Sequence, residues 1–106
     1  MATKTQIIPY QESSFPNFLS KLNSICDENK NNNLIVDLSE IDNLSLSDIK
    51  LFIDFSKEHQ KLKKSFVIVA KNVDFNKIPV KLTVVPTLQE AKDSIEMEEI
   101  ERDLGF

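Results

Sequence analysis

Two short segments that are apolar almost throughout constrain the fold of this chain more than any other feature of its sequence. They are residues 34–38 (LIVDL) and residues 65–70 (SFVIVA), and turn-forming residues flank the first of them. A strand with apolar residues on both faces is typical of a parallel sheet covered by helices, whereas a half-exposed strand alternates polar and apolar residues. The two segments therefore predict a layered α/β domain with a largely parallel sheet.

Amphipathic helical patterns alternate with the strands. Serine, threonine and proline residues mark where the helices begin, because hydroxyl side chains cap the free amides of a first helical turn. The clearest start pairs Thr87 with Glu90, three residues later, which is the spacing of a capping box. We expect strands at residues 5–9, 34–38, 65–70 and 82–85, and helices at about residues 15–26, 48–60 and 87–104.

The length of 106 residues fits one domain with one core. We predict a single domain over residues 1–106, with about four mostly parallel strands, crossover helices and an acidic C-terminal helix. The chain has no apolar run near the roughly 20 residues of a membrane helix. It also has no signal-peptide pattern and only one cysteine, too few for an internal disulfide. These features predict a cytoplasmic protein without a membrane partner.

Charge is distributed unevenly along the sequence. Residues 57–81 carry seven lysines against two acidic residues, whereas residues 90–103 carry seven acidic residues against two basic ones. Clustered lysines can neutralise the phosphates of nucleic acids. The lysine block has no arginine and no aromatics at stacking spacing, and the formal net charge of the chain is -4. We therefore interpret the block as a solvated face and expect no nucleic-acid partner.

The residue sets of common active sites are missing from the sequence. A phosphate-binding loop needs glycines that let backbone amides approach the ligand, and Gly105 is the only glycine. His59 is the sole histidine and Cys26 the sole cysteine, which are too few for a zinc site. We expect His59 at the surface, near the polar end of its helix. We also expect no catalytic residue, no cofactor and no metal.

Four acidic residues gather near the end of the second predicted strand: Asp37, Glu40, Asp42 and Asp48. They fit either a site for a cation or phosphate, or solvated turn and cap groups, and we favour the second interpretation. A degenerate receiver domain of a two-component system is an alternative, with Asp37 at the end of its strand. Receivers place an acidic pair after the first strand, where this chain has Pro9, Tyr10 and Gln11.

Residues 34–49 resemble the central segment of STAS domains, the sulfate-transporter and anti-sigma-factor-antagonist family. Residues 66–70 and 85–91 also stand where that fold places its next strand and its terminal helix. The resemblance implies a STAS-like regulatory domain that works by binding another protein and is not an enzyme. In phosphoregulated members, a partner kinase phosphorylates a serine at the start of the helix after this strand, and that position matches Ser47. The rest of the family's Asp-Ser-Ser-Gly motif is absent, so we predict Ser47 first as a helix cap, a role shared with Ser45, and second as a phosphosite.

The whole chain is also similar to a small family of Bacteroidetes proteins, through residues 64–67, 74–76, 85–91 and 97–106. Members of that family are often labelled ribonuclease Z. The resemblance implies ribonuclease Z and a regulatory kinase as candidate partners, and a second copy of the chain is a third candidate. The alternative, a tRNA-processing enzyme, conflicts with the single histidine, because ribonuclease Z holds two zinc ions with several histidines and aspartates.

The last predicted helix carries two apolar stripes. At about 100° per residue, Ile100 lies roughly 140° around the helix from Ile95, so one straight helix cannot bury both stripes on one sheet. One alternative is a break near Met97, with the tail folded back onto its own domain. The other is a docking extension at residues 97–106 that binds a partner or a second copy. Its partner-binding residues are Met97, Ile100, Leu104 and Phe106.

Overall fold

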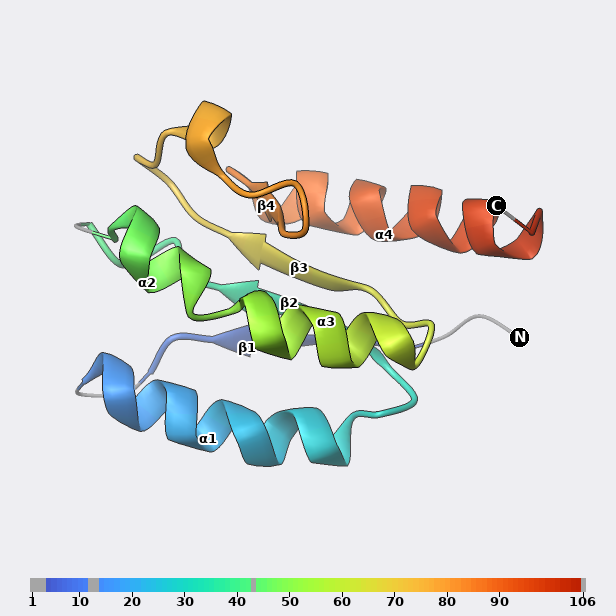
Figure 1. The fold of residues 1–106 in the computed structure, drawn as a ribbon, viewed down its shortest axis with the longest axis horizontal. Coiled ribbons are helices and arrows are strands. Elements are labelled where there is room, and N and C mark those ends of the chain that lie inside the picture. The colour runs from blue at the N-terminus through green and yellow to red at the C-terminus, as the bar shows by residue number, and fades with distance from the viewer. Residues whose placement is uncertain (1–3, 12–13, 43, 106) are drawn as a thin grey trace.

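Four parallel strands form one sheet whose order follows the order of the chain. The structure is a computed structural model that describes residues 4–11, 14–42 and 44–105. The strands lie side by side in the order β1-β2-β3-β4, and every neighbouring pair is parallel, as Figure 1 shows. This confirms the predicted α/β class. The strands are β1 (Thr5–Pro9), β2 (Asn33–Asp37), β3 (Phe66–Val69) and β4 (Thr83–Val85).

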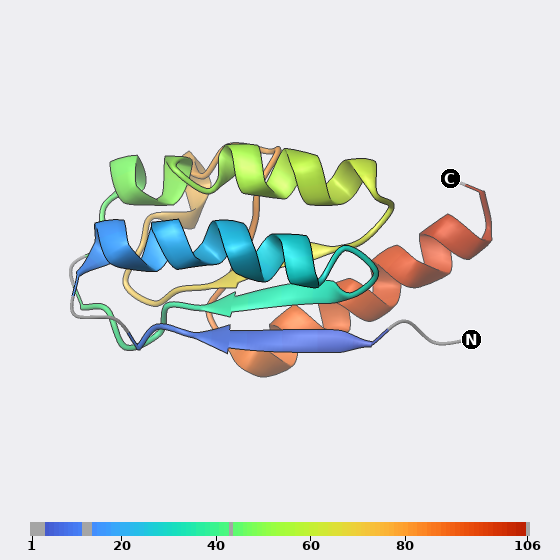
Figure 2. The ribbon, with the colours of Figure 1, turned by 90° about the horizontal axis from the view of Figure 1, so that it is seen from below.

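The helices cover the two faces of the sheet unequally. Crossover connections between parallel strands are nearly always right-handed. When each new strand is added on the same side of the previous one, these connections all lie on one face of the sheet. The helices α1, α2 and α3 and the short 3-10 helix η1 therefore lie on the same side, and α4 alone covers the other (Figures 1 and 2). The bounds are α1 (Phe15–Glu28), α2 (Leu46–Lys50), α3 (Ile53–Lys61), η1 (Phe75–Lys77) and α4 (Leu88–Asp103).

The two faces of the sheet belong to two separate apolar clusters. Leu34 and Val36 of β2 point toward α1 and α3, whereas Ile35, between them, points toward α4. All four residues of β3 are buried, as the continuous apolar pattern predicted. On the far face, Ala91 and Ile95 of α4 complete the smaller cluster. Helix α4 is thus fixed to the sheet by its N-terminal half.

The predicted second helix is interrupted. The structure divides it into α2 and α3, with a tight turn at Leu51 and Phe52 between them. The amide of Phe52 donates to the carbonyl of Ile49, three residues back, at 3.0 Å. This tighter turn changes the helix phase, and the ring of Phe52 is completely buried in the larger core. Sequence periodicity missed the interruption because it contains neither glycine nor proline.

Helix α4 is longer than the strands it covers. Its 16 residues span about 24 Å at 1.5 Å per residue, and the four residues of β3 span about 13 Å. The C-terminal half of α4 therefore projects past the amino-terminal ends of the strands (Figures 1 and 2). The helix is continuous through Met97, so the expected alternative of a break there is wrong. Among the described residues, no helix combines the length and apolar character needed to cross a membrane.

Candidate functional site

The inner face of α4 changes from apolar to polar along its length. Ala91 and Ile95 pack on the sheet and are buried. Glu98 and Arg102 continue the same line of the helix toward its C-terminus, because they follow at steps of three and four residues. They lie where the helix leaves the sheet, so the apolar contact gives way to a polar one.

Ser65, just before β3, holds this polar part of α4. The Ser65 hydroxyl donates to Oε1 of Glu98 at 2.7 Å and accepts from Nη2 of Arg102 at 3.1 Å. Glu98 and Arg102 also form an ion pair, with Oε1 and Nη1 3.9 Å apart. Ser65 is completely buried, so these bonds fix the rotation of α4 about its axis. We call Ser65, Glu98 and Arg102 the clamp.

A buried asparagine supports the clamp from the neighbouring strand. Oδ1 of Asn33 accepts from the backbone amide of Ser65 at 2.8 Å, which fixes the orientation of the side-chain amide. Nδ2 of Asn33 is buried and has no hydrogen-bond partner among the described residues. Sequence reasoning did not single out Asn33, Ser65 or Arg102. The available signal was a polar residue directly before the apolar run of each central strand.

The outer face of α4 carries the apolar residues predicted to bind a partner. Met97, Ile100 and Leu104 are 61%, 49% and 66% exposed, and they form one stripe along the overhanging half of the helix. The clamp holds the opposite side of the same turns, so the stripe points away from the sheet. Phe106, the fourth predicted residue, lies outside the described residues. Exposed acidic side chains line the stripe: Asp93, Glu96, Glu101 and Asp103.

Ser47, the predicted phosphosite, is exposed in the first turn of α2. It is not the helix cap, and that part of the prediction is wrong. The Ser45 hydroxyl accepts from the amide of Asp48 at 3.1 Å, and the Asp48 carboxylate accepts from the amide of Ser45 at 3.2 Å. Only Ser45 stands three residues before Asp48, the spacing that the reciprocal capping box requires.

His59 is buried, which corrects the prediction that it lies on the surface. Nε2 of His59 donates to the carbonyl of Asn32 at 2.6 Å, and the ring meets Phe66 edge-on at a centroid distance of 6.2 Å. Burial lowers the pKa of His59; the Asn32 carbonyl opposes this shift, and the charge of Lys64 adds to it. His59 is therefore a neutral core residue that ties α3 to the turn before β2.

Two of the four acidic residues at and after the end of β2 stabilise local structure. Oδ1 of Asp37 accepts from the amide of Ser39 at 3.0 Å, and Asp48 belongs to the capping box. Glu40 and Asp42 are exposed. Within residues 4–11, 14–42 and 44–105, no three His, Cys, Asp or Glu side chains come together to hold a metal ion. Their bonds are those of turn and cap groups.

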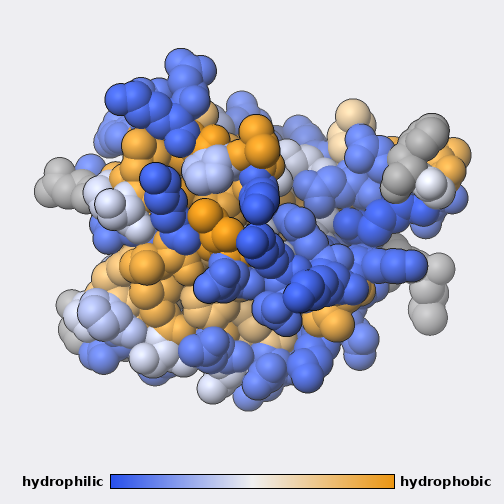
Figure 3. Space-filling model, in the orientation of Figure 1, coloured by the Kyte–Doolittle hydropathy of each residue, from blue (hydrophilic) through white to orange (hydrophobic). Residues whose placement is uncertain are grey.

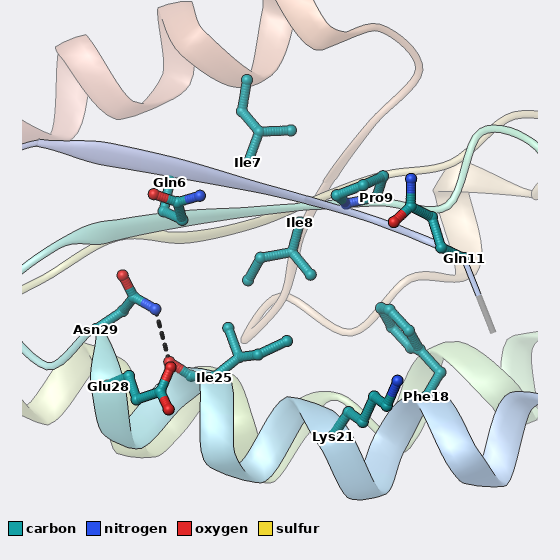
Figure 4. A pocket seen from close by; sticks show the side chains of 10 residues that line it. All are labelled: Gln6, Ile7, Ile8, Pro9, Gln11, Phe18, Lys21, Ile25, Glu28 and Asn29. Atoms are coloured by element: carbon teal, nitrogen blue, oxygen red, sulfur yellow. Dashed lines mark hydrogen bonds between the residues drawn. The ribbon is translucent and has the colours of Figure 1, made fainter.

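Two grooves flank α1. The first, of about 540 Å³, runs between α1 and the free edge of β1. Ile8, Phe18 and Ile25 point into it, whereas Ile7 points to the other side of the strand (Figure 4). Pro9 has no amide hydrogen to offer an added strand, so it limits pairing at this edge.

The second groove, of about 690 Å³, lies between α1 and α3. Cys26, Phe55 and Leu62 are among its lining residues. Burial, with a smaller effect of Asp27, raises the pKa of Cys26 to about 11, so its thiol is a poor nucleophile. In Figure 3, apolar side chains gather over the half of this face that is farther from the C-terminus.

Comparison of the chain with protein-family models and curated proteins identified no relative. No protein-family model matches the chain, and no curated protein is significantly similar to it. The resemblance to STAS domains and to the Bacteroidetes family therefore stays a prediction.

Proposed function

We propose that this chain is a non-enzymatic, STAS-like protein-interaction domain that docks on its partner through the outer face of α4. One observation carries the proposal. The stripe of Met97, Ile100 and Leu104 is exposed on a helix whose opposite side is already held by the sheet and the clamp. Amphipathic helices bind protein grooves with residues at this spacing.

Ser47 is the proposed regulatory phosphosite. Its hydroxyl is exposed, and the capping role belongs to Ser45, so a kinase could modify Ser47 without removing the cap. A phosphate would add about -1.5 to -2 charges near the helix N-terminus, where the carboxylate of Asp48 offsets part of the benefit. Intact-mass measurement of protein from its native cells should show one added phosphate, and a fragment spectrum that places the phosphate on another residue would exclude this role.

The docking surface can be tested with a stripe variant, Met97→Ser/Ile100→Ser/Leu104→Ser. Wild-type and variant proteins serve as bait in native lysate, and purified ribonuclease Z and a regulatory kinase serve as direct candidates. We expect the variant to lose the partner that wild type retains while keeping its circular dichroism spectrum. An unchanged set of partners would refute the proposal.

A matched control removes three other exposed apolar side chains, Leu51→Ser/Leu62→Ser/Val80→Ser. These residues are 51%, 43% and 101% exposed and lie away from α4. We expect this control to bind as wild type does. If only the control loses the partner, the interaction surface is elsewhere, with the groove between α1 and α3 the first place to look. Cleavage of a tRNA precursor with zinc or manganese that Asp37→Asn abolishes would instead support the enzyme alternative.

A further inference from the structure

The stripe on α4 has acidic side chains on both sides. At about 100° per residue, Met97, Ile100 and Leu104 fall within an arc of roughly 60°. Glu96 lies about 70° to one side of the middle of this arc, and Glu101 lies about 70° to the other. Both are exposed, and so is Asp103 in the last turn. The basic residue of that turn, Arg102, is held on the opposite side by Ser65.

This charge pattern argues against a second copy of α4 as the occupant. A symmetric pair of α4 helices would bring the acidic sides of one stripe against those of the other. Like charges at such a contact repel, and unpaired carboxylates lose hydration when the apolar residues meet. A symmetric dimer through the stripe is therefore disfavoured at low ionic strength.

Neither groove beside α1 fits better, and the groove at β1 has one lysine, Lys21, and one acidic residue, Glu28, in its lining. The groove between α1 and α3 is lined by three acidic side chains, Asp27, Asp54 and Glu58, and by two lysines, Lys30 and Lys61. Oε1 of Glu58 already pairs with Nζ of Lys61 at 3.2 Å. This groove therefore offers an acidic helix no net positive charge, and a head-to-tail contact through it lacks charge complementarity.

We propose that the stripe binds an apolar groove bordered by lysine or arginine side chains on another protein, and that its acidic border keeps the chain from pairing with itself. The inference rests on the proposed function and adds the chemistry of the partner. Electrostatic complementarity of this kind favours the right partner and disfavours wrong ones, and its effect decreases as salt increases.

A charge-reversed copy of the chain provides a defined probe of that chemistry. The variant Glu96→Lys/Glu101→Lys/Asp103→Lys keeps the stripe and the clamp but gives the stripe a basic border. Within the described part of the chain, none of these three side chains forms a hydrogen bond or ion pair that the variant would break, and lysine is favourable near a helix C-terminus. Circular dichroism checks that the variant is folded before it is used.

Sedimentation of wild type, variant and their equimolar mixture gives the readout. We expect the mixture to associate about tenfold or more tightly than either protein alone, a difference of about 1.4 kcal/mol. High salt should reduce this difference, and Met97→Ser/Ile100→Ser/Leu104→Ser in the wild-type partner should abolish the mixed association. A neutral-border variant, Glu96→Gln/Glu101→Gln/Asp103→Asn, should self-associate more than wild type and serves as a second test.

Three outcomes would overturn the inference. They are a mixture that associates no better than wild type, a wild-type chain that already pairs through the stripe at low salt, and a mixed pair that survives the stripe substitutions. None of them decides the proposed function, which is judged separately by whether the stripe variant loses its cellular partner. The oppositely charged copies could associate as expected while the stripe variant still binds its cellular partner. In that case the stripe can associate, but it is not the docking surface proposed above.

Discussion

Ile95 and Ile100 are two identical side chains on one helix for which we predict losses of stability of very different size on replacement by alanine. Ile95 is 3% exposed and packs on the sheet, whereas Ile100 is 49% exposed on the outer stripe. Ile95→Ala and Ile100→Ala remove the same atoms and gain the same helix propensity. Any difference in their free energies of unfolding therefore reports the surroundings of each side chain.

The expected magnitudes follow from burial. Removing the three outer carbons of a buried isoleucine costs about 2.4 kcal/mol at about 0.8 kcal/mol per carbon, and the cavity left behind adds to this. We expect Ile95→Ala to cost about 3 kcal/mol. About half of the transfer cost applies to Ile100, and the better helix propensity of alanine returns a few tenths of a kcal/mol. Ile100→Ala should therefore cost about 1 kcal/mol or less.

Urea unfolding followed by circular dichroism separates these values. With a slope of about 1–3 kcal/mol per M urea, Ile95→Ala should lower the midpoint by about 1–3 M. In a thermal scan the same loss lowers Tm by roughly 12–24 °C, at about 4–8 °C per kcal/mol for a domain near this size. An equally large loss in Ile100→Ala would mean that the stripe is part of the domain's own core, and the docking assignment would then be wrong.

Three further predictions concern the cap, the histidine and the clamp. Ser45→Ala should cost about 1 kcal/mol in urea unfolding, and Ser47→Ala should change the midpoint little, because only Ser45 caps α2; the reverse order would overturn this assignment. The pKa of His59 is lower in the folded than in the unfolded chain, so the unfolded chain binds more protons at acidic pH. The contribution of His59 to the free energy of unfolding should therefore be complete above about pH 6.5 and decrease as the pH falls below that value. His59→Gln should lack this component, and equal pH profiles for the two proteins would contradict it. Arg102→Ala should speed amide exchange in the last turns of α4, and unchanged exchange would show that the clamp does not hold the helix.

Much of the fold could be predicted because local patterns and tertiary contacts agree. Residues 34–38 and 66–69 have few structural alternatives, since an unbroken apolar run must be buried on both faces. The capping residues Ser14 and Thr87 also start helices where expected, with Ser14 accepting from Asn17 and Thr87 from Glu90. These features depend on neighbours within a few positions, and such neighbours are visible in the sequence.

Two of the incorrect predictions, those for His59 and for the lysine block, depend on the arrangement of residues distant in sequence. A polar neighbourhood made His59 look like a surface residue, but Phe66 and the carbonyl of Asn32 give it a buried site. The lysine block is not one face either, because Lys63 and Lys64 precede β3 whereas Lys71 follows it, so they lie at opposite ends of the strand. A linear charge count cannot detect that separation.

The strand order explains why the carboxyl ends of the described strands form no binding crevice. It also explains why α4 offers an exposed apolar surface instead. Ligands of open α/β sheets bind where the strand order reverses, because adjacent loops then diverge to opposite faces and leave a crevice. The order here never reverses, so the connections after β1, β2 and β3 all cross the same face and no such crevice forms. Helix α4 follows β4, the edge strand of the described sheet, and lies alone on the opposite face. The C-terminal turns of α4 extend past the sheet. On their inner side, Glu98 and Arg102 hydrogen-bond to Ser65. The apolar side chains of Met97, Ile100 and Leu104 therefore belong to neither apolar cluster of the described domain, and the partner that we propose would cover them.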